Sequence, residues 1–139
     1  MEIRKIDAEQ TWELRHKVMW PDKEYHHVKL TDDQVGMHYG LFDKGMLISV
    51  ISLFTDDDHN VQLRKFATDQ DCQSKGYGTK LLCFVLEQAR NLGAHKVWCN
   101  ARKNKIVFYE KFEFYQVGKE FYRDGIEYVL MSKTYYHSE

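Results

Sequence analysis

The pattern that most restricts the fold of this chain lies in residues 61–101. The segment VQLRKFAT (61–68) alternates like a strand, a loop with two glycines follows, and HKVWCNA (95–101) is again strand-like. Between the loop and the second strand, apolar residues recur at helical spacing from about Tyr77 to Leu92. A strand–helix–strand unit of this length predicts two parallel strands joined by a crossover.

Further strand-like and helical segments flank this unit. Strands are predicted over EIRKI (2–6), MHYGLF (37–42), MLISVISLF (46–54), EFYQVG (113–118) and IEYVLMSKT (126–134). Helices are predicted over AEQTWELRHKVM (8–19) and NKIVFYEKF (104–112), and residues 20–36 read as a long polar loop. The order predicts an α+β, or mixed α/β, domain whose early strands pair antiparallel.

Length and composition limit the classes of function. The chain has 139 residues, which suits one domain over 1–139, and its 20 basic and 21 acidic residues give a formal charge of -1. A protein that coats nucleic acid usually has a basic surplus, so we expect no nucleic-acid partner. The start MEIRKID is not a signal peptide, and no apolar run approaches the ~20 residues of a membrane span, so we expect a cytoplasmic protein without a membrane partner.

Three cysteines, Cys72, Cys83 and Cys99, raise the alternative of a metal site. They form no C-x-x-C pair and have no histidine at ligand spacing, so we read them as reduced thiols and expect no metal. The acidic segment TDDDH (55–59) is interpreted as a solvated hairpin tip rather than a metal-binding loop.

The loop DQDCQSKGYGTKLL (69–82) places Gly76 and Gly78 where the long helix begins. A helix N-terminus has unpaired N–H groups and a partial positive charge, and glycine allows a ligand to approach the backbone, so the pattern favours a phosphorylated ligand, with Lys75 and Lys80 adding charge. The spacing fits neither the nucleotide P-loop nor the dinucleotide fingerprint, which needs a third glycine where Leu81 stands. The alternative is that the two glycines only shape a turn.

The segment QSKGYG (Gln73 to Gly78) resembles the Q/R-x-x-G-x-G/A signature of the GNAT superfamily of N-acetyltransferases. Downstream, NARKNKIVFYEKFEF resembles the region N-x-x-x-F-Y-E-K-x-G-F of the same family. The match is good from about Val61 to Phe114, and the first helix and loop resemble small bacterial members more weakly. Two departures are Glu113, where the family has glycine, and Lys105, where it has a small residue.

The resemblance implies a central mixed, mostly antiparallel sheet of about seven strands, splayed between the fourth and fifth, with about four flanking helices. It also implies that acetyl-CoA is bound as the acyl donor. The residues then expected to contact the donor are Phe66, Ala67, Thr68, Gln73, Ser74, Lys75, Gly76, Tyr77, Gly78, Thr79, Asn104, Phe108, Tyr109 and Lys111. Asn104 has the alternative role of capping the helix that follows it.

The resemblance further implies direct attack of an amine on the thioester. Tyr109 is expected to protonate the leaving thiolate, although it could simply pack in the core. His38 is a candidate general base, although histidines in strands are often structural. Arg15, His26 and His27 lie in the segments expected to cover the acceptor and could bind an acidic group there, unless they form a solvated surface.

The sequence therefore predicts an acetyl-CoA-dependent N-acetyltransferase acting on a primary amine of a small molecule, peptide or protein. Two alternatives remain open: a non-catalytic acyl-CoA sensor, and an interaction domain in which the glycines only form a turn. Aromatic residues of the C-terminal hairpin could line an acceptor pocket or the face of a homodimer: Tyr115, Phe121, Tyr122 and Tyr128.

Overall fold

The computed structural model describes residues 1–136 and contains two compact units. The first unit comprises Met1–Phe54 and Leu63–Gln88, and the second comprises Thr55–Gln62 and Ala89–Glu139. The expectation of a single domain over the whole chain stays a prediction, and the two units are described in turn.

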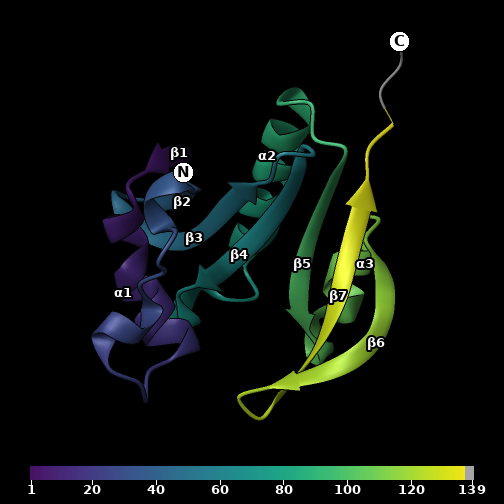
Figure 1. Ribbon diagram of the computed structural model, residues 1–139. Helices are drawn as coiled ribbons and strands as arrows, with labels where there is room; N and C mark the ends of the chain where they lie inside the picture. Colours follow the sequence, from purple (N-terminus) through teal and green to yellow (C-terminus); the bar gives the residue numbers. More distant parts are fainter. Residues whose placement is uncertain (137–139) are drawn as a thin grey trace. The chain divides into compact units, whose positions relative to one another are not determined.

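The elements of the described residues alternate much as the sequence predicts (Figure 1). In chain order they are β1 (Glu2–Ile6), α1 (Trp12–Leu14), β2 (Met37–Asp43), β3 (Met46–Thr55), β4 (Asn60–Thr68), α2 (Tyr77–Asn91), β5 (Lys96–Arg102), α3 (Ile106–Glu110), β6 (Tyr115–Arg123) and β7 (Ile126–Thr134). Three α-helices, rather than about four, are thus assigned in residues 1–136, together with short 3₁₀ and π segments.

The seven strands follow the order β1-β2-β3-β4-β5-β7-β6. The pairs β1–β2, β2–β3, β5–β7 and β6–β7 are antiparallel, whereas β4 and β5 are parallel. The parallel register joins three residue pairs, from Asn60–Lys96 to Gln62–Trp98, at the start of the two strands. The predicted fold class is therefore confirmed: a mixed, mostly antiparallel sheet whose parallel crossover contains the long helix and whose β4 and β5 splay after a short paired stretch.

In the first unit, residues 8–19 are helical but do not form the single α-helix predicted. A 3₁₀ turn over Ala8–Thr11 leads into one α turn, and a π-helical segment over Arg15–Met19 follows. π segments are rare and are frequently found at functional sites. This change of helix type is not encoded in the apolar spacing, which is why the sequence pattern missed it.

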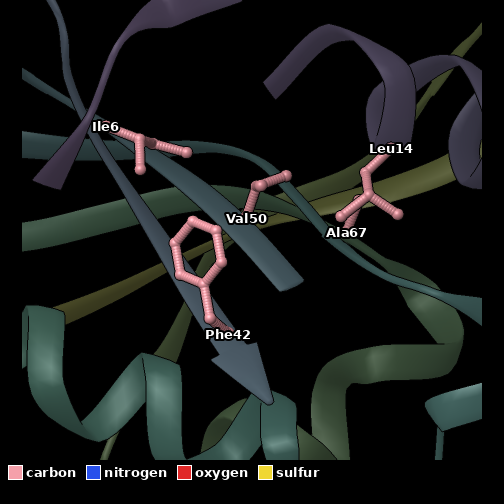
Figure 2. Packing of buried hydrophobic residues seen from close by; sticks show 5 residues of the cluster. All are labelled: Ile6, Leu14, Phe42, Val50 and Ala67. Carbon is pink, nitrogen blue, oxygen red and sulfur yellow. The ribbon is translucent and has the colours of Figure 1, made fainter. Parts of the chain in front are cut away.

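The core of the first unit forms where apolar residues from five elements, β1, α1, β2, β3 and β4, meet (Figure 2). Its buried members are Ile6, Leu14, Phe42, Val50 and Ala67, with Val18, Met19 and Leu47 packed partly against them. Burying such side chains contributes about 1.5–3 kcal/mol each, which fixes the register of β2 and β3.

In the second unit, β7 pairs with β5 on one side and with β6 on the other. Alternate residues of β5, namely Val97, Cys99 and Ala101, are buried. The strand predicted to end at Gly118 continues to Arg123, past an irregularity of the register between Val117 and Phe121. Gly118 there has a φ of 76°, which only glycine adopts without strain.

The residues described include no helix of sufficient length and apolar character to pass through a bilayer.

Candidate functional site

The two glycines of the predicted anion loop serve different purposes. Gly76 has a φ of 86°, and a Cβ built on it would meet nothing within 4 Å. The backbone conformation alone therefore requires glycine there, and the space beside it is open. Gly78 has an ordinary φ, but its Cβ would lie 3.3 Å from Phe66 Cζ and 3.4 Å from Thr68 Oγ1. Gly78 thus lets the first turn of α2 pack closely on the end of β4.

The start of α2 offers backbone donors to a ligand. The N–H of Lys80 donates to the carbonyl of Gly76 at 3.1 Å, which closes the first turn. The N–H groups of Tyr77, Gly78 and Thr79 precede this bond, where a helix has no partner of its own for them. The residues from Gln73 to Gly76 are exposed, so the loop is accessible. A 15-residue helix adds a partial positive charge at this end.

The residues that lead into this loop are held against β3. Ser49 Oγ donates to the carbonyl of Ala67 at 3.2 Å and lies 2.8 Å from Thr68 Oγ1. The N–H of Asp69 donates to the carbonyl of Ile48 at 2.8 Å. Gln73, predicted to contact the donor, turns its Nε2 to the carbonyl of Thr68 at 3.0 Å and so folds the loop onto itself.

Two polar contacts connect the loop to segments that sequence reasoning did not assign to it. Lys17 Nζ, in the π segment, donates to Asp69 Oδ2 at 3.0 Å, and this bond raises the pKa of Lys17 and lowers that of Asp69. Tyr77 Oη donates to Asp43 Oδ2 at 2.7 Å. No periodicity or motif in the sequence indicates either pairing, because the partners are 52 and 34 positions apart.

Strand β4 departs from regular alternation just before the loop. Lys65 has a φ of 55°, a left-handed conformation that is uncommon for residues other than glycine. In a regular strand, Lys65 would share a face with Val61 and Leu63, but a left-handed residue interrupts that alternation. Such strained positions often lie near functional sites. Here the irregularity immediately precedes Phe66, Ala67 and Thr68, whose backbone is predicted to bind the donor.

Tyr109, the predicted proton donor, is buried in the second unit at 8% exposure. Its ring meets Phe108 edge-on at 5.2 Å and Phe114 at 5.4 Å. Its hydroxyl also hydrogen-bonds to Cys99 on β5. Burial, followed by the contact with Cys99, raises the pKa of Tyr109 well above its ordinary value. Burial likewise raises the pKa of the Cys99 thiol to about 12, against the opposing effect of the bond from Tyr109.

The other predicted donor contacts of this unit lie around α3. Asn104 is exposed in a 3₁₀ turn over Lys103–Lys105, and the residue in the cap position of α3 is Lys105. The alternative in which Asn104 caps the helix is therefore wrong. Phe108 packs between Tyr109 and Phe112, and Lys111 is exposed. Glu113, which replaces the family glycine, keeps a left-handed φ of 69°, so the turn survives at some cost in strain.

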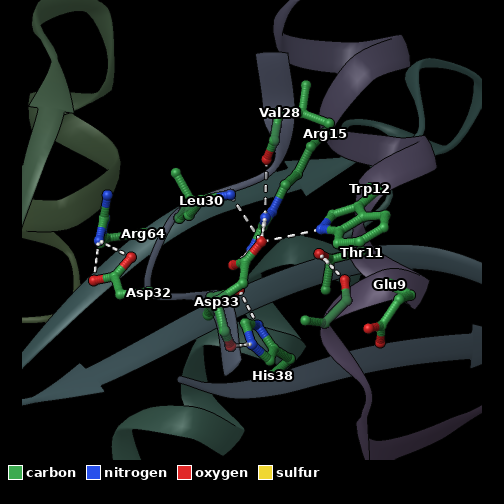
Figure 3. Close-up of polar contacts among 12 residues, drawn as sticks. Glu9, Thr11, Trp12, Arg15, Val28, Leu30, Asp32, Asp33, His38 and Arg64 are labelled. Atoms are coloured by element: carbon green, nitrogen blue, oxygen red, sulfur yellow. Dashed lines mark hydrogen bonds and ion pairs between the residues drawn. The ribbon is translucent and has the colours of Figure 1, made fainter. Parts of the chain in front are cut away.

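Arg15 does not face solvent but lies at the centre of a buried polar cluster (Figure 3). It is 0% exposed. Its Nη1 donates to Asp33 Oδ2 at 2.9 Å and to the carbonyl of Val28 at 3.0 Å. Its Nη2 donates to Asp33 Oδ1 and to Ser52 Oγ, each at 3.0 Å. These bonds give Arg15 an anchoring role in holding the polar loop (20–36), in place of the contact with acceptor expected from the sequence.

The same cluster holds His38. Its Nε2 donates to the carbonyl of Asp33 at 2.8 Å, so in the neutral ring Nδ1 accepts from Ser52 Oγ at 2.7 Å. Both ring nitrogens are therefore engaged, and the ring is 3% exposed. The geometry favours the structural alternative for His38 over a general base. Burial alone would raise the pKa of Asp33, but hydrogen bonds from Arg15, the Leu30 N–H and Trp12 outweigh it and lower that pKa.

His26 and His27, the remaining predicted acceptor contacts, are exposed in a 3₁₀ turn over Tyr25–Val28. His26 Nδ1 lies 3.2 Å from Glu24 Oε2. The ring of His27 meets Trp20 edge-on at 5.3 Å. They are thus available to a ligand, and neither joins the buried cluster.

The aromatic residues of the C-terminal hairpin separate into two groups. Phe121 and Tyr128 stack on each other at 5.8 Å across β6 and β7. Tyr115 and Tyr122 are 50% and 71% exposed. Over residues 1–136, no group of three or more histidine, cysteine or acidic side chains is arranged to hold a metal ion.

The structure therefore brings residues 66–79 together in the first unit, together with the cluster of Arg15 and His38. Asn104, Phe108, Tyr109 and Lys111 are together in the second unit. Sequence reasoning gave no site role to Asp43, Ser49, Ser52 or Asp33, and it read Cys99 only as a reduced thiol. Their roles depend on partners supplied by distant parts of the chain, and isolated polar residues give no local signal of such partners.

Comparisons with known proteins are consistent with one family. The family model described as an acetyltransferase (GNAT) domain matches residues 4–135. The uncharacterized N-acetyltransferase YitI of Bacillus subtilis strain 168 is 28% identical over 143 residues, covering 96% of this chain and 96% of that protein. The ribosomal-protein-S18-alanine N-acetyltransferase of Escherichia coli has a TM-score of 0.83 at 16% identity, covering 99% of this chain and 96% of its own. A GNAT family acetyltransferase from Elizabethkingia anophelis with acetyl-CoA bound has a TM-score of 0.76 at 18% identity, covering 96% and 97%.

Proposed function

Because this chain belongs to the GNAT acetyltransferase family, we propose that it transfers the acetyl group of acetyl-CoA to a primary amine of a small molecule or protein. The observation that carries the proposal is the loop at the start of α2. It combines an open left-handed glycine, a second glycine packed on β4, and three backbone N–H groups at a helix N-terminus. This arrangement suits the diphosphate of a nucleotide-like ligand.

The residues present fit the acyl donor at its diphosphate. The N–H groups of Tyr77, Gly78 and Thr79 would donate to the phosphate oxygens, and the open space beside Gly76 lets them approach the backbone. Lys75 is exposed at the rim and would add positive charge. Acetyl-CoA supplies the activated acetyl group as a thioester, and a backbone N–H between Phe66 and Thr68 would polarise its carbonyl.

In the reaction, a bond forms between the acceptor nitrogen and the carbonyl carbon as the carbon–sulfur bond breaks. Overall, one amine proton ends on the departing thiol. Tyr109 is the proposed donor to that sulfur. Its raised pKa keeps it protonated across the neutral range. A thiol has a reference pKa near 8.5, so full transfer from a phenol of higher pKa is uphill. We therefore infer that Tyr109 first stabilises the developing thiolate by a hydrogen bond.

The acceptor is proposed to be an amine presented to the polar loop over residues 20–36. Arg15 and Asp33 would hold this loop in place from beneath, because their ion pair is buried. His26 and His27 are the exposed members of the loop that could contact an acidic group of the acceptor. His38 would support the loop through Asp33 rather than remove the amine proton.

The proposal is tested in two steps. Isothermal titration calorimetry with acetyl-CoA first asks whether the protein binds the donor, and the absence of binding would refute the proposal. A thiol-release assay with acetyl-CoA and a panel of amines and peptides then asks for transfer. Binding without transfer to any amine would favour the acyl-CoA sensor instead.

Once an acceptor is known, the variant Tyr109→Phe tests whether Tyr109 acts as the proton donor to the leaving sulfur. We expect a fall of about 100-fold or more in kcat with little change in KM for acetyl-CoA, because a general acid typically contributes about 10²- to 10⁴-fold. Unchanged turnover across pH would show that Tyr109 only packs.

A further inference from the structure

Tyr77 stands between the two glycines of the loop and is the first residue of α2. Its hydroxyl donates to Asp43 Oδ2 at 2.7 Å, a usual length for a well-formed hydrogen bond between oxygens. Asp43 is the last residue of β2 and begins the tight turn, through Lys44 and Gly45, into β3. The contact therefore ties the first helical residue of α2 to a hairpin of the sheet.

The hydrogen bond between Tyr77 and Asp43 lies beside the two glycines, where the backbone has the greatest conformational freedom. Gly76 immediately precedes Tyr77, has a φ of 86°, and has nothing within 4 Å of a Cβ position. Glycine samples more conformations than any other residue, so this turn depends on contacts elsewhere to stay ordered. Gly78 adds a second flexible position directly after Tyr77. The side chain of Tyr77 is the group between them that reaches a strand hairpin.

We propose that Asp43 and Tyr77 are positioning residues for the acyl donor, and that their hydrogen bond holds the first turn of α2 with its N–H groups aligned for the diphosphate. The proposal rests on the donor-binding function proposed above. Neither side chain needs to touch the ligand. Their effect is to raise the fraction of molecules whose loop is ready to bind, and the apparent dissociation constant is inversely proportional to that fraction.

The charges around Asp43 and Tyr77 favour a stable hydrogen bond between them. The hydrogen bond from Tyr77 is the main cause that lowers the pKa of Asp43, against an opposing effect of desolvation. The N-terminal ammonium, 4.0 Å from Asp43 Oδ1, and the positive charge and backbone N–H of Lys44 also lower it. The bond to Asp43 likewise raises the pKa of Tyr77. Asp43 thus stays an acceptor and Tyr77 a donor throughout the neutral range. Lys44 also offsets part of the negative charge that Asp43 would otherwise present to an anion.

The decisive variant is Tyr77→Phe, which keeps the ring and removes only the hydroxyl. Binding of CoA, which needs no acceptor, is measured by calorimetry at 25 °C. We expect the dissociation constant to rise about fivefold, the size of effect that loss of one hydrogen bond to a charged group can produce at a partly exposed site. Tyr122→Phe is the matched control, because Tyr122 also bonds to a carboxylate, Glu127, but on the C-terminal hairpin. Its affinity should match that of the unmodified protein.

A second set of variants separates alignment of the loop from a general effect on stability. Asp43→Asn keeps an oxygen acceptor and should retain most of the affinity, whereas Asp43→Ala should lose about as much as Tyr77→Phe. These two variants remove the same charge, so their difference reports the acceptor alone. The double variant of Tyr77→Phe with Asp43→Ala should bind no more weakly than either single variant.

Each outcome decides the proposal. If the unmodified protein binds CoA and Tyr77→Phe binds it equally well, the positioning role is overturned while the donor-binding function stands. Additive losses in the double variant would overturn it as well, because independent effects are not those of one bond. If the unmodified protein fails to bind CoA, the proposed function and this inference fall together. Should Tyr77→Phe not fold, the comparison of Asp43→Asn with Asp43→Ala gives the same decision.

Discussion

The buried ion pair of Arg15 and Asp33 allows a test of how burial changes the contribution of an ion pair to the free energy of unfolding. Asp33→Asn keeps the size and shape of the side chain but removes its charge. The guanidinium of Arg15, which is 0% exposed, is then left in the interior with no counterion among the contacts that it makes. The variant also weakens acceptance of the Trp12 and Leu30 N–H bonds, at 3.0 and 2.9 Å.

The expected cost follows from this geometry. Removing one partner of a buried, hydrogen-bonded pair typically lowers the free energy of unfolding by about 3–5 kcal/mol, because the remaining charge stays desolvated. A domain of this size has a total of about 5–15 kcal/mol, so the variant would lose a large part of its stability. With a urea m-value of about 2 kcal/mol/M, the midpoint should move down by about 2 M.

The neighbouring residue provides the control. Asp32 pairs with Arg64 at 3.1 Å, but the side chains of Asp32 and Arg64 are 47% and 28% exposed. Asp32→Asn removes the same charge one position away and should cost less than about 1 kcal/mol, as exposed pairs do. Equilibrium urea unfolding of both variants, followed by circular dichroism, measures the two costs. If Asp33→Asn costs no more than Asp32→Asn, the reasoning from burial is wrong.

The other predictions concern pH, backbone strain and thiol reactivity. Because the folded pKa of Asp33 is lowered, its stabilisation is present above the unfolded pKa near 3.9 and is lost as pH falls through the folded value, so urea unfolding should show the gap between the unmodified protein and Asp33→Asn closing below about pH 4. Gly76→Ala, at a φ of 86°, should lower the free energy of unfolding by about 1 kcal/mol, whereas Glu113→Gly, at a φ of 69°, should raise it by up to about 1 kcal/mol. Thermal unfolding measures both, and a change in the same direction for the two variants would refute the strain argument. Iodoacetamide at pH 8 should modify exposed Cys83 well before buried Cys99, whose pKa is about 12, as read by peptide mass spectrometry.

Much of the fold could be predicted because the signals are local. The strand over 126–134 was predicted with its observed bounds, and the start of α2 at Tyr77 followed from the glycines and the apolar stripe. The family resemblance in QSKGYG is confirmed by the family match over residues 4–135. The helix over 8–19 could not be predicted in detail, because α, 3₁₀ and π turns share nearly the same apolar spacing over a single turn.

In the candidate site too, the residues with a local sequence signal could be predicted and those that depend on distant partners could not. Gly76 and Gly78 were identified because glycine has a conformational signature that stands out in a sequence. Arg15 was a candidate for acceptor binding and His38 for the general base, with a structural role as its alternative. The structure places both in a buried polar cluster that local sequence patterns do not indicate. Their actual partners, Asp33 and Ser52, lie 18 and 37 positions from Arg15.

By itself, the order of residues determined the strand and helix pattern, the parallel crossover and the glycine turn, because each depends on periodicity or backbone freedom within a few residues. Only the tertiary structure decided which polar side chains meet: Arg15 with Asp33, Tyr77 with Asp43, and Tyr109 with Cys99. A hydrogen bond between distant residues is selected by the packing of the elements that carry them, and packing is a property of the whole folded chain.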